Sequence, residues 1–308
     1  MHAHSHDHDH QHQHHHPHST GRAFAISIGL NLIFVVVEWA YGVMANSLAL
    51  IADATHNFGD VMGLVLAWGA MALARRPPSA RFTYGLRGST ILAALGNAML
   101  LLVATGGIAW EAIRRFDSTG AINETVMIWV AVLGVLINAG TAMLFMRGSK
   151  SDLNVRGAYL HMAADAAVSL GVVMAGVVML YTGWIWLDPL ASLLIVTVIF
   201  VGTWGLLRDS VRLALQAAPE NVNPMDVRRF LVGLPGVAEM HDLHIWAMST
   251  TETALTVHLV MPAGHPGDEF FENVIHQIEE QFHIGHATIQ IETGTSSNPC
   301  VLAPDHVV

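Results

Sequence analysis

The sequence has few charged residues and a single cysteine. Only 12% of its 308 residues are Asp, Glu, Lys or Arg, which is about half the share found in an ordinary soluble domain. Cys300 is the only cysteine, so a disulfide-stapled scaffold is excluded. Basic residues are scarce as well: 14 Lys and Arg stand against 24 Asp and Glu, for a formal net charge of -10. That balance argues against a nucleic-acid partner.

Long apolar stretches dominate the first two thirds of the chain. Six of them occupy residues 24–43, 48–74, 91–113, 126–146, 159–181 and 184–207. Each has about 20 residues or more, enough for a helix to cross a hydrocarbon core of about 30 Å. Buried helices of a large soluble protein are the alternative, but so many apolar runs would leave no polar faces for water. The sequence therefore predicts an α-helical membrane protein with six transmembrane helices in a lipid bilayer.

The basic residues predict the orientation of these helices. Ten of them fall on one side, at Arg22, Arg75, Arg76, Arg81, Arg87, Arg147, Lys150, Arg156, Arg208 and Arg212, and two on the other, at Arg114 and Arg115. Basic residues near helix ends favour the cytoplasmic side, so we expect both termini in the cytoplasm. The polar, histidine-rich start does not resemble a cleaved signal peptide, and the lone cysteine suits a reducing compartment.

The composition changes after residue 215. Residues 216–294 have ordinary charge density and predict a helix starting at Asn223-Pro224, strands over 237–248 and 253–261, a helix over 268–282 and a strand over 286–292. This order predicts a small α+β domain that gains stability from dimerisation or metal. We expect four regions: a cytoplasmic His-rich tail (1–20), a transport domain (21–215), a cytoplasmic α+β domain (216–294) and a flexible tail (295–308).

Ionisable residues inside the apolar stretches cost free energy to place in a membrane, so their presence there indicates a function. His56 and Asp60 are four residues apart in the second stretch, and His161 and Asp165 repeat that spacing in the fifth. Each pair lies on one helix face. Two imidazoles and two carboxylates match the ligands of a tetrahedral Zn²⁺ site. The alternative is that these residues form hydrogen bonds between packed helices, which is less easily reconciled with two matched pairs.

Three further polar residues in the first two stretches are candidates for supporting roles. Asp53 precedes His56 by three residues and is either an acceptor for an imidazole N–H or a proton-carrying group. Glu38 in the first stretch has either of these roles or bonds to a neighbouring helix. Asn57 is adjacent to His56, and we regard Asp53 and Asn57 as accessory residues of the site.

These residues resemble the cation diffusion facilitator family, and in particular its bacterial cobalt–zinc–cadmium resistance exporters. The resemblance rests on SLALIADATHNFGD (47–60), FTYG (82–85), HMAAD (161–165), DP (188–189), HDLHIW (241–246) and HATIQIE (286–292). It implies a multi-pass protein of the bacterial inner membrane and a ferredoxin-like, metallochaperone-like cytoplasmic domain. It also implies a homodimer that exports Zn²⁺, with Cd²⁺ and Co²⁺, in exchange for protons, without an organic cofactor.

The resemblance also implies functions for individual residues. His56, Asp60, His161 and Asp165 correspond to the family's transport site, and His241, His258, His286 and Glu292 to its cytoplasmic metal site. A regular strand from His286 to Glu292 would separate the two by about 20 Å, so both join one site only if the strand begins later. Cys300 and His306 are further candidate ligands in the C-terminal tail. Structural binding, regulatory sensing and no binding remain open for this domain.

The amino-terminal tail departs from the family pattern. Many members have a His-rich loop between spans four and five, whereas here ten of the 20 histidines fall within the first 18 residues. The tail is either a tether that collects metal or a segment without a role.

Other function classes are weighed against export. An intramembrane metallohydrolase would require a motif such as H-E-x-x-H and an open metal position, which the sequence lacks. A membrane-anchored metal-binding sensor and a metal-conducting uniporter or channel are the remaining alternatives. A sensor would bind metal without flux, and a channel would conduct it without proton exchange.

Overall fold

The computed structural model describes residues 18–117, 120–146, 153–295 and 300–304. Most of the histidine-rich tail, the basic loop at 147–152 and His306 lie outside these residues. The chain divides into two compact units, which are considered separately. The first contains the described parts of Met1–Phe58 and Trp110–Ile195, and the second those of Gly59–Ala109 and Val196–Val308.

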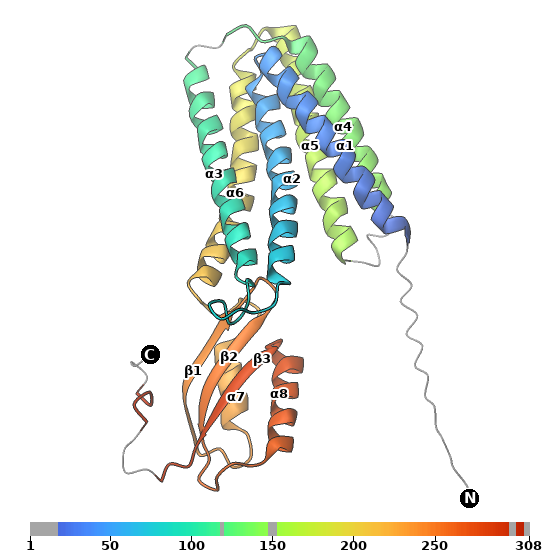
Figure 1. Cartoon of the computed structure of the whole chain (residues 1–308). Coiled ribbons are helices and arrows are strands. Elements are labelled where there is room, and N and C mark those ends of the chain that lie inside the picture. The colour runs from blue at the N-terminus through green and yellow to red at the C-terminus, as the bar shows by residue number, and fades with distance from the viewer. Residues whose placement is uncertain (1–17, 118–119, 147–152, 296–299, 305–308) are drawn as a thin grey trace, which may run out of the picture. The chain divides into compact units, whose positions relative to one another are not determined.

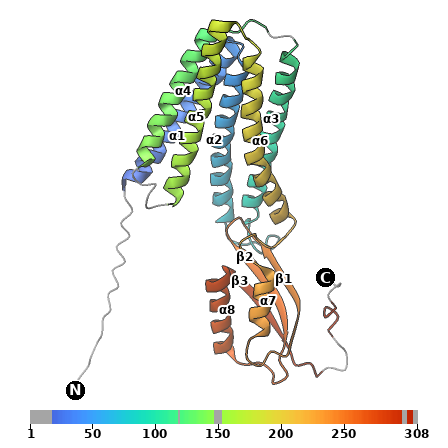
Figure 2. The same cartoon turned by 180° about the vertical axis from the view of Figure 1, so that it is seen from behind.

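The first unit is a group of closely packed helices. Helices α1 (His18–Met44), α4 (Glu124–Met146) and α5 (Leu153–Thr182) lie side by side in it, as Figures 1 and 2 show from opposite sides. Glycine permits the close approach: a Cβ at Gly134 would lie 2.8 Å from Phe34 Cζ, and one at Gly176 would lie 2.7 Å from Ile128 Cγ1. Small residues at such contacts are typical of helix packing in membranes, where backbones approach closely.

Three helices contribute to both units: α2 (Leu48–Ala74), α3 (Ser89–Arg115) and α6 (Leu187–Ala214). In the second unit, α2 and α3 again pack through glycine. A Cβ at Gly59 would overlap Leu101, and one at Gly63 would lie 2.8 Å from Asn97 Nδ2. The sequence pattern that places small residues on α2 therefore determines how closely α3 lies against it.

The helices have the length and surface of membrane spans. Within the described residues, α2, α3, α4, α6 and residues Val155–Thr182 of α5 are long and apolar enough to cross a membrane, and Gly29–Met44 of α1 is a shorter apolar helix. Large apolar side chains point outward from them, among them Trp68 (72% exposed), Val103 (75%) and Trp129 (70%). Such surfaces are unfavourable in water and suit lipid. The chain is a multi-pass membrane protein.

The boundaries of α2, α3 and α4 agree closely with the apolar stretches, and those of the other three helices differ. The helices α1 and α5 begin at His18 and Leu153, each six residues before the predicted stretch, because apolarity does not report helix that extends past the hydrocarbon region. The helix α6 begins at Leu187 rather than at residue 184 and ends at Ala214 rather than at residue 207. Gly183 has a φ of 70°, and this left-handed residue separates α5 from the turn that precedes α6.

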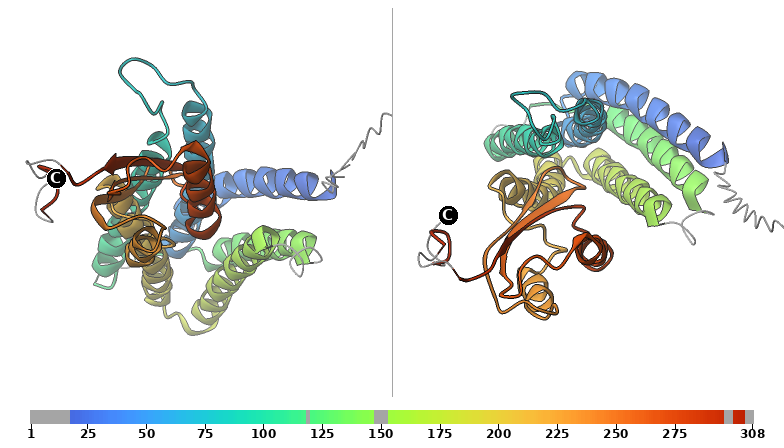
Figure 3. Two further views of the ribbon diagram at one scale, coloured as in Figure 1. Left: turned by 90° about the horizontal axis from the view of Figure 1, so that it is seen from below. Right: turned by 60° about the horizontal axis from the view of Figure 1, so that its bottom comes forward.

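The C-terminal domain has the predicted order of helices and strands. It contains α7 (Pro224–Val232), β1 (Glu239–Ala247), β2 (Thr253–Val260), α8 (Asp268–Phe282) and β3 (His286–Glu292). The sheet order is β1-β2-β3, with β1 antiparallel and β3 parallel to β2. Both helices cover the same face of the sheet (Figure 3). Asn223 caps α7 as predicted, since its side chain accepts a hydrogen bond from Met225 N at 3.0 Å.

The core of this domain lies between the sheet and its two helices. Leu231 of α7, Leu255 and Leu259 of β2 and Ile278 of α8 are fully buried in one cluster. Burial of each such side chain contributes about 1.5–3 kcal/mol to folding. This core holds the strands that carry the histidines of the domain in fixed register.

A buried carboxylate joins the beginnings of α2 and α6 within the first unit. Asp188 of α6 accepts hydrogen bonds from Ser47 Oγ at 2.6 Å, Leu48 N at 2.8 Å and Ala49 N at 3.1 Å. The first amides of a helix lack partners within the helix and carry positive partial charge, so a carboxylate there both satisfies and stabilises them. Asp188 thus caps α2 from a different helix.

Substitution Asp188→Ala should therefore destabilise the protein. It leaves three buried donors without their acceptor, which costs about 2–4 kcal/mol, whereas Asp188→Asn retains one acceptor oxygen and should cost less. Thermal unfolding of the detergent-solubilised protein measures the difference. Thr182→Ala, which removes an exposed hydroxyl that donates to Val178 O and accepts from Trp184 N, is the control. Equal melting temperatures for wild type and Asp188→Ala would contradict the capping role.

Candidate functional site

The first candidate site lies between α2 and α5 in the first unit. His56 Nε2 is 3.7 Å from Asp165 Oδ1, and His161 Nε2 is 3.6 Å from Asp165 Oδ2. The two imidazole rings face each other edge to face, with their centroids 6.2 Å apart. Asp165 is only 3% exposed. One buried carboxylate therefore lies between two imidazoles that come from different helices.

These separations are close to those within a metal site. A tetrahedral zinc ion with ligand distances of about 2.0–2.2 Å separates neighbouring ligand atoms by about 3.3–3.6 Å. The observed nitrogen–oxygen distances of 3.6 and 3.7 Å therefore require little movement to accommodate an ion. Two imidazoles with carboxylate oxygen form a donor set that suits zinc and similar divalent metals better than Mg²⁺ or Ca²⁺.

Asp60 follows His56 by one turn of the continuous helix α2. Its side chain is half-buried and belongs to the second compact unit. The structure thus brings His56, His161 and Asp165 together within one unit. The helical spacing of four residues places Asp60 on the same face of α2 as His56.

The accessory residues form a buried polar group with Glu38. Ser169 Oγ donates a hydrogen bond to Asp53 Oδ2 at 3.0 Å, and Asn57 Nδ2 donates one to Glu38 Oε2 at 3.4 Å. Asn57 follows Asp53 by one turn of α2, so Glu38 lies beside the face of α2 that carries Asp53. Asp53 is therefore held by α5, and Asn57 by α1.

The second candidate site lies at one end of the C-terminal sheet. His241, His258, Glu292 and Cys300 each offer one ligand atom, and these atoms lie within 4.8 Å of one another. His258 Nδ1 is 3.0 Å from Glu292 Oε1 and 3.7 Å from Cys300 Sγ, while His241 Nε2 is 3.4 Å from Glu292 Oε1. Two imidazoles, a carboxylate and a thiol are a donor set for zinc or cadmium.

Strand register brings these ligands together. His241 of β1 and His258 of β2 are partners across the antiparallel ladder, and Glu292 at the end of β3 is beside Val260. The ladder is irregular between His241 and His244, where Asp242 has a φ of 53°. A bulge of this kind turns adjacent side chains away from strict alternation.

Asp242 uses this position to orient the neighbouring histidines. Its carboxylate oxygens lie 3.5 Å from His258 Nε2 and 2.8 Å from His244 Nε2. A carboxylate on one ring nitrogen favours the tautomer whose other nitrogen is free to bind metal. His258 is therefore prepared to bind through Nδ1, the atom that faces Glu292 and Cys300.

The electrostatics of this cluster suit a metal that displaces protons. Partial desolvation acts to raise the pKa of Glu292, but the hydrogen bond with Cys300 and the nearby His241 and His258 outweigh it and hold the pKa below its ordinary value. A backbone hydrogen bond at Leu302 acts to lower the pKa of the Cys300 thiol, yet the effects of Glu292, desolvation and Asp242 raise it overall. The thiol proton is thus retained until a cation neutralises the carboxylates.

His286 lies apart from this cluster. It is the first residue of β3, paired with Ala254, whereas Glu292 is the last residue of the same strand. Its ring instead contacts Tyr84 edge to face, with centroids 5.5 Å apart. The strand does begin at His286, so the regular extended geometry separates His286 from Glu292. The structure brings Cys300 to the position that His286 was expected to occupy.

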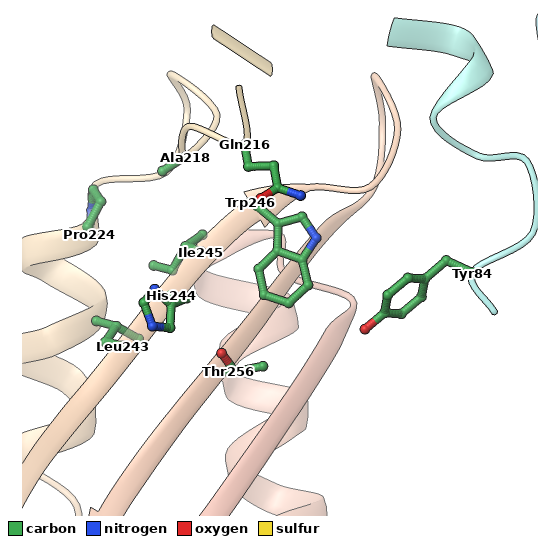
Figure 4. A pocket seen from close by; sticks show the side chains of 9 residues that line it. All are labelled: Tyr84, Gln216, Ala218, Pro224, Leu243, His244, Ile245, Trp246 and Thr256. Carbon is green, nitrogen blue, oxygen red and sulfur yellow. The ribbon is translucent and has the colours of Figure 1, made fainter. Parts of the chain in front are cut away.

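A cavity of about 620 Å³ lies elsewhere in the second unit (Figure 4). Its lining includes His244 and Trp246 of β1, Thr256 of β2 and Tyr84 from the segment between α2 and α3. His244 is the only residue among those lining it that commonly binds metal, so this cavity lacks a ligand set.

Sequence reasoning named Cys300 only as one of two candidate ligands in the C-terminal tail, because cysteine is a common metal ligand, and it did not identify Asp242. The other tail candidate, His306, lies outside the described residues. Asp242 had no signal in the sequence, because its role depends on a bulge that alternation does not predict.

Comparisons with known proteins agree with the two-part architecture. Residues 24–213 match the cation efflux transmembrane domain, and residues 219–294 match the cytoplasmic domain of cation efflux proteins. The chain is 38% identical to the cation efflux system protein CzcD of Alcaligenes sp. (strain CT14) over 84% of this chain and 82% of that protein. It is 36% identical to the zinc transporter ZitB of Escherichia coli (strain K12), over 84% and 83%. It is 34% identical to the cadmium, cobalt and zinc/H(+)-K(+) antiporter of Bacillus subtilis (strain 168), over 84% and 85%.

These matches cover most of the chain, and they agree with the membrane helices and the metal-ligand clusters described above. The chain therefore belongs to the cation diffusion facilitator family and is a divalent metal cation efflux transporter.

Proposed function

We propose that the protein exports Zn²⁺, and also Cd²⁺ and Co²⁺, from the cytoplasm across a bacterial inner membrane in exchange for protons. The observation that carries this proposal is the buried carboxylate of Asp165 between His56 and His161. The names of the related ZitB and Bacillus subtilis proteins, which refer to zinc and to cadmium, cobalt and zinc, support the choice of metals.

The proposed transport site consists of His56, Asp60, His161 and Asp165. Asp60 completes it because its position one turn after His56 places its carboxylate on the same helix face. Asp53 and Asn57 are accessory residues that hold α2 in position and do not bind the metal themselves. Two imidazoles make the site softer than one built from oxygen alone, which favours Zn²⁺ over Mn²⁺.

Proton exchange follows from the chemistry of these ligands. Metal binding requires neutral imidazoles and ionised carboxylates, so protons and metal compete for the same atoms. Imidazole titrates near pH 6.5, within the physiological range. A site that faces the cytoplasm releases protons as it takes up metal, and protons displace the metal when the site faces outward. Exchange is obligatory if the empty, unprotonated site reorients slowly.

We propose six spans with both termini in the cytoplasm, α1 being the first. The predicted regions 1–20, 21–215, 216–294 and 295–308 follow from this arrangement, and the matched residues 24–213 and 219–294 support the two central ones. The C-terminal domain, with its ferredoxin-like order of elements, provides the contact surface of a homodimer. The histidine-rich tail collects metal at the cytoplasmic side.

The cytoplasmic cluster of His241, His258, Glu292 and Cys300 is proposed as a resident zinc site. A metal there would fix the segment that follows β3 against the sheet, because Cys300 is the ligand that lies outside the strands. A structural role and a regulatory role for the metal both require that Cys300 be held against the sheet in this way.

Transport should be abolished by Asp60→Ala or Asp165→Ala, since each removes an anionic ligand from a dehydrated ion. Zinc uptake into everted vesicles with an internal zinc dye measures this, with Asp209→Ala as the control. Asp209 is an exposed carboxylate of α6 paired with Arg208 at 3.2 Å, and its removal should leave flux unchanged. Normal zinc flux in either site variant would contradict the four-ligand assignment. Binding without flux in the wild type would indicate a sensor, and flux without proton movement a channel.

The substitution His56→Asp should relax discrimination against Mn²⁺. It replaces an imidazole with a hard carboxylate, so competition by Mn²⁺ for zinc transport should strengthen by about tenfold or more. Transport of zinc by wild type and variant is measured over a series of Mn²⁺ concentrations. An unchanged ranking of metals would show that His56 does not determine selectivity.

Zinc or Cd²⁺ should protect Cys300 from alkylation. Because Cys300 is the only cysteine, the rate of reaction with a maleimide reports this site alone. Protection should be about tenfold or more in wild type, be lost in His258→Ala and Glu292→Ala, and persist in His286→Ala. Loss of protection in His286→Ala, with retention in Glu292→Ala, would show that His286 rather than Glu292 belongs to the ligand set.

A further inference from the structure

Two acidic side chains in the first unit are buried close to each other. Glu38 of α1 is 0% exposed and Asp53 of α2 is 1% exposed. Asn57, which donates a hydrogen bond to Glu38, lies one turn after Asp53 on the same face of α2. Two neighbouring carboxylates that are removed from water and have no basic partner disfavour double ionisation, so one of them keeps a proton. In this arrangement the pair holds one proton and one negative charge.

The surrounding hydrogen bonds identify the atoms that share this proton. Asn57 Nδ2 donates to Glu38 Oε2, and Ser169 Oγ donates to Asp53 Oδ2. Glu38 Oε1 and Asp53 Oδ1 are buried and have no hydrogen-bond partner within the described part of the chain. These two oxygens are left for the shared proton. Each carboxyl is thus fixed by a neutral donor on one oxygen and by the common proton on the other.

The charges around the pair make it sensitive to a metal ion. His56 on α2 and Asp165 on α5 are ionisable groups that act electrostatically on it. Glu38 is the only charged residue of α1 from Gly29 to Met44, and the residues buried along α4 are uncharged. The carboxylate of Asp188 in α6 is already hydrogen-bonded to residues at the start of α2. A divalent cation held by His56, His161 and Asp165 would therefore supply strong positive charge beside the pair.

We propose that Glu38 and Asp53 form a proton-binding site, separate from the metal ligands, that releases its proton when a divalent cation binds between α2 and α5. The inference rests on the proposed transport function and adds a second place where the counter-ion is held. Asp53 precedes His56 by three residues, about 4.5 Å along the helix axis. The two positive charges of the metal stabilise the doubly ionised pair, so the proton leaves. When the metal departs, one proton returns to the pair.

Amide substitutions imitate the protonated pair. In Glu38→Gln the carboxylate of Asp53 accepts from the new amide and from Ser169, and in Asp53→Asn that of Glu38 accepts from Asn57 and the new amide. Either variant keeps the single negative charge and the shape of the singly protonated pair, but neither has a proton to release. Zinc should still bind between α2 and α5.

The protons released on zinc binding are counted in detergent-solubilised full-length protein, in weak buffer with a pH-sensitive dye. Each amide variant should release about one proton fewer per zinc bound than wild type, and the slope of log Kd against pH should fall by about one. The tail and the cytoplasmic site contribute equally to all variants. Glu111→Gln is the matched control, because it is the same change at a carboxylate paired with Arg115 at 3.1 Å, and it should release as many protons as wild type.

Each result of the proton count and the zinc-binding measurement either supports or overturns the inference. Wild-type proton counts in both amide variants overturn the inference, as does loss of zinc binding in both, since the pair would then be needed for binding itself. A loss of about one proton in either variant with zinc binding retained supports it. The count is a binding measurement, so it does not depend on flux. Absence of zinc transport by wild-type vesicles would instead refute the proposed function.

Discussion

A polar group inside a membrane-spanning helix needs a partner, because neither lipid nor apolar side chains can supply one. Hydroxyl and carboxylate groups in these helices find partners in two ways. Hydroxyls bond back to their own helix, as Thr55 does to Ile51 O at 2.7 Å and Thr141 to Ile137 O at 2.9 Å. Carboxylates instead find partners on other helices, as Asp188 and Asp53 do. Contacts between helices are therefore specified largely by where the few acidic residues lie.

This constraint determines how α2 is positioned. Its first amides are capped by Asp188 of α6, Asp53 is held by Ser169 of α5, and Asn57 bonds to Glu38 of α1. Three helices thus hold one face of α2 through its first two and a half turns. His56 lies within this fixed segment, so its approach to Asp165 is set by contacts that involve no metal. A preformed arrangement of this kind reduces the cost of ordering ligands on binding.

Local patterns predicted much of this from the sequence. The apolar stretch at 48–74 coincides with α2, and the amphipathic pattern at 268–282 with α8, because hydrophobic periodicity is a property of each segment alone. The spacing of His161 and Asp165 likewise placed both on one helix face. The hydrogen bond between Glu38 and Asn57 could not be predicted, since it depends on how α1 packs on α2. Cys300 was underestimated for a similar reason: strand spacing says nothing about a segment that returns to the sheet after β3.

The two ligand clusters differ in a way that matches different residence times for metal. The cytoplasmic one includes a thiol, and thiolate binds Zn²⁺ and Cd²⁺ strongly, which suits an ion that stays. The cluster between α2 and α5 offers imidazole and carboxylate, ligands that protons can displace near neutral pH. In the proposed site of four ligands, two of them anionic, a bound divalent cation would leave the site neutral. Neutrality matters because a net charge within the hydrocarbon region is expensive. The same reasoning requires that the empty site take up positive charge before it reorients, and protons are the cations its ligands accept.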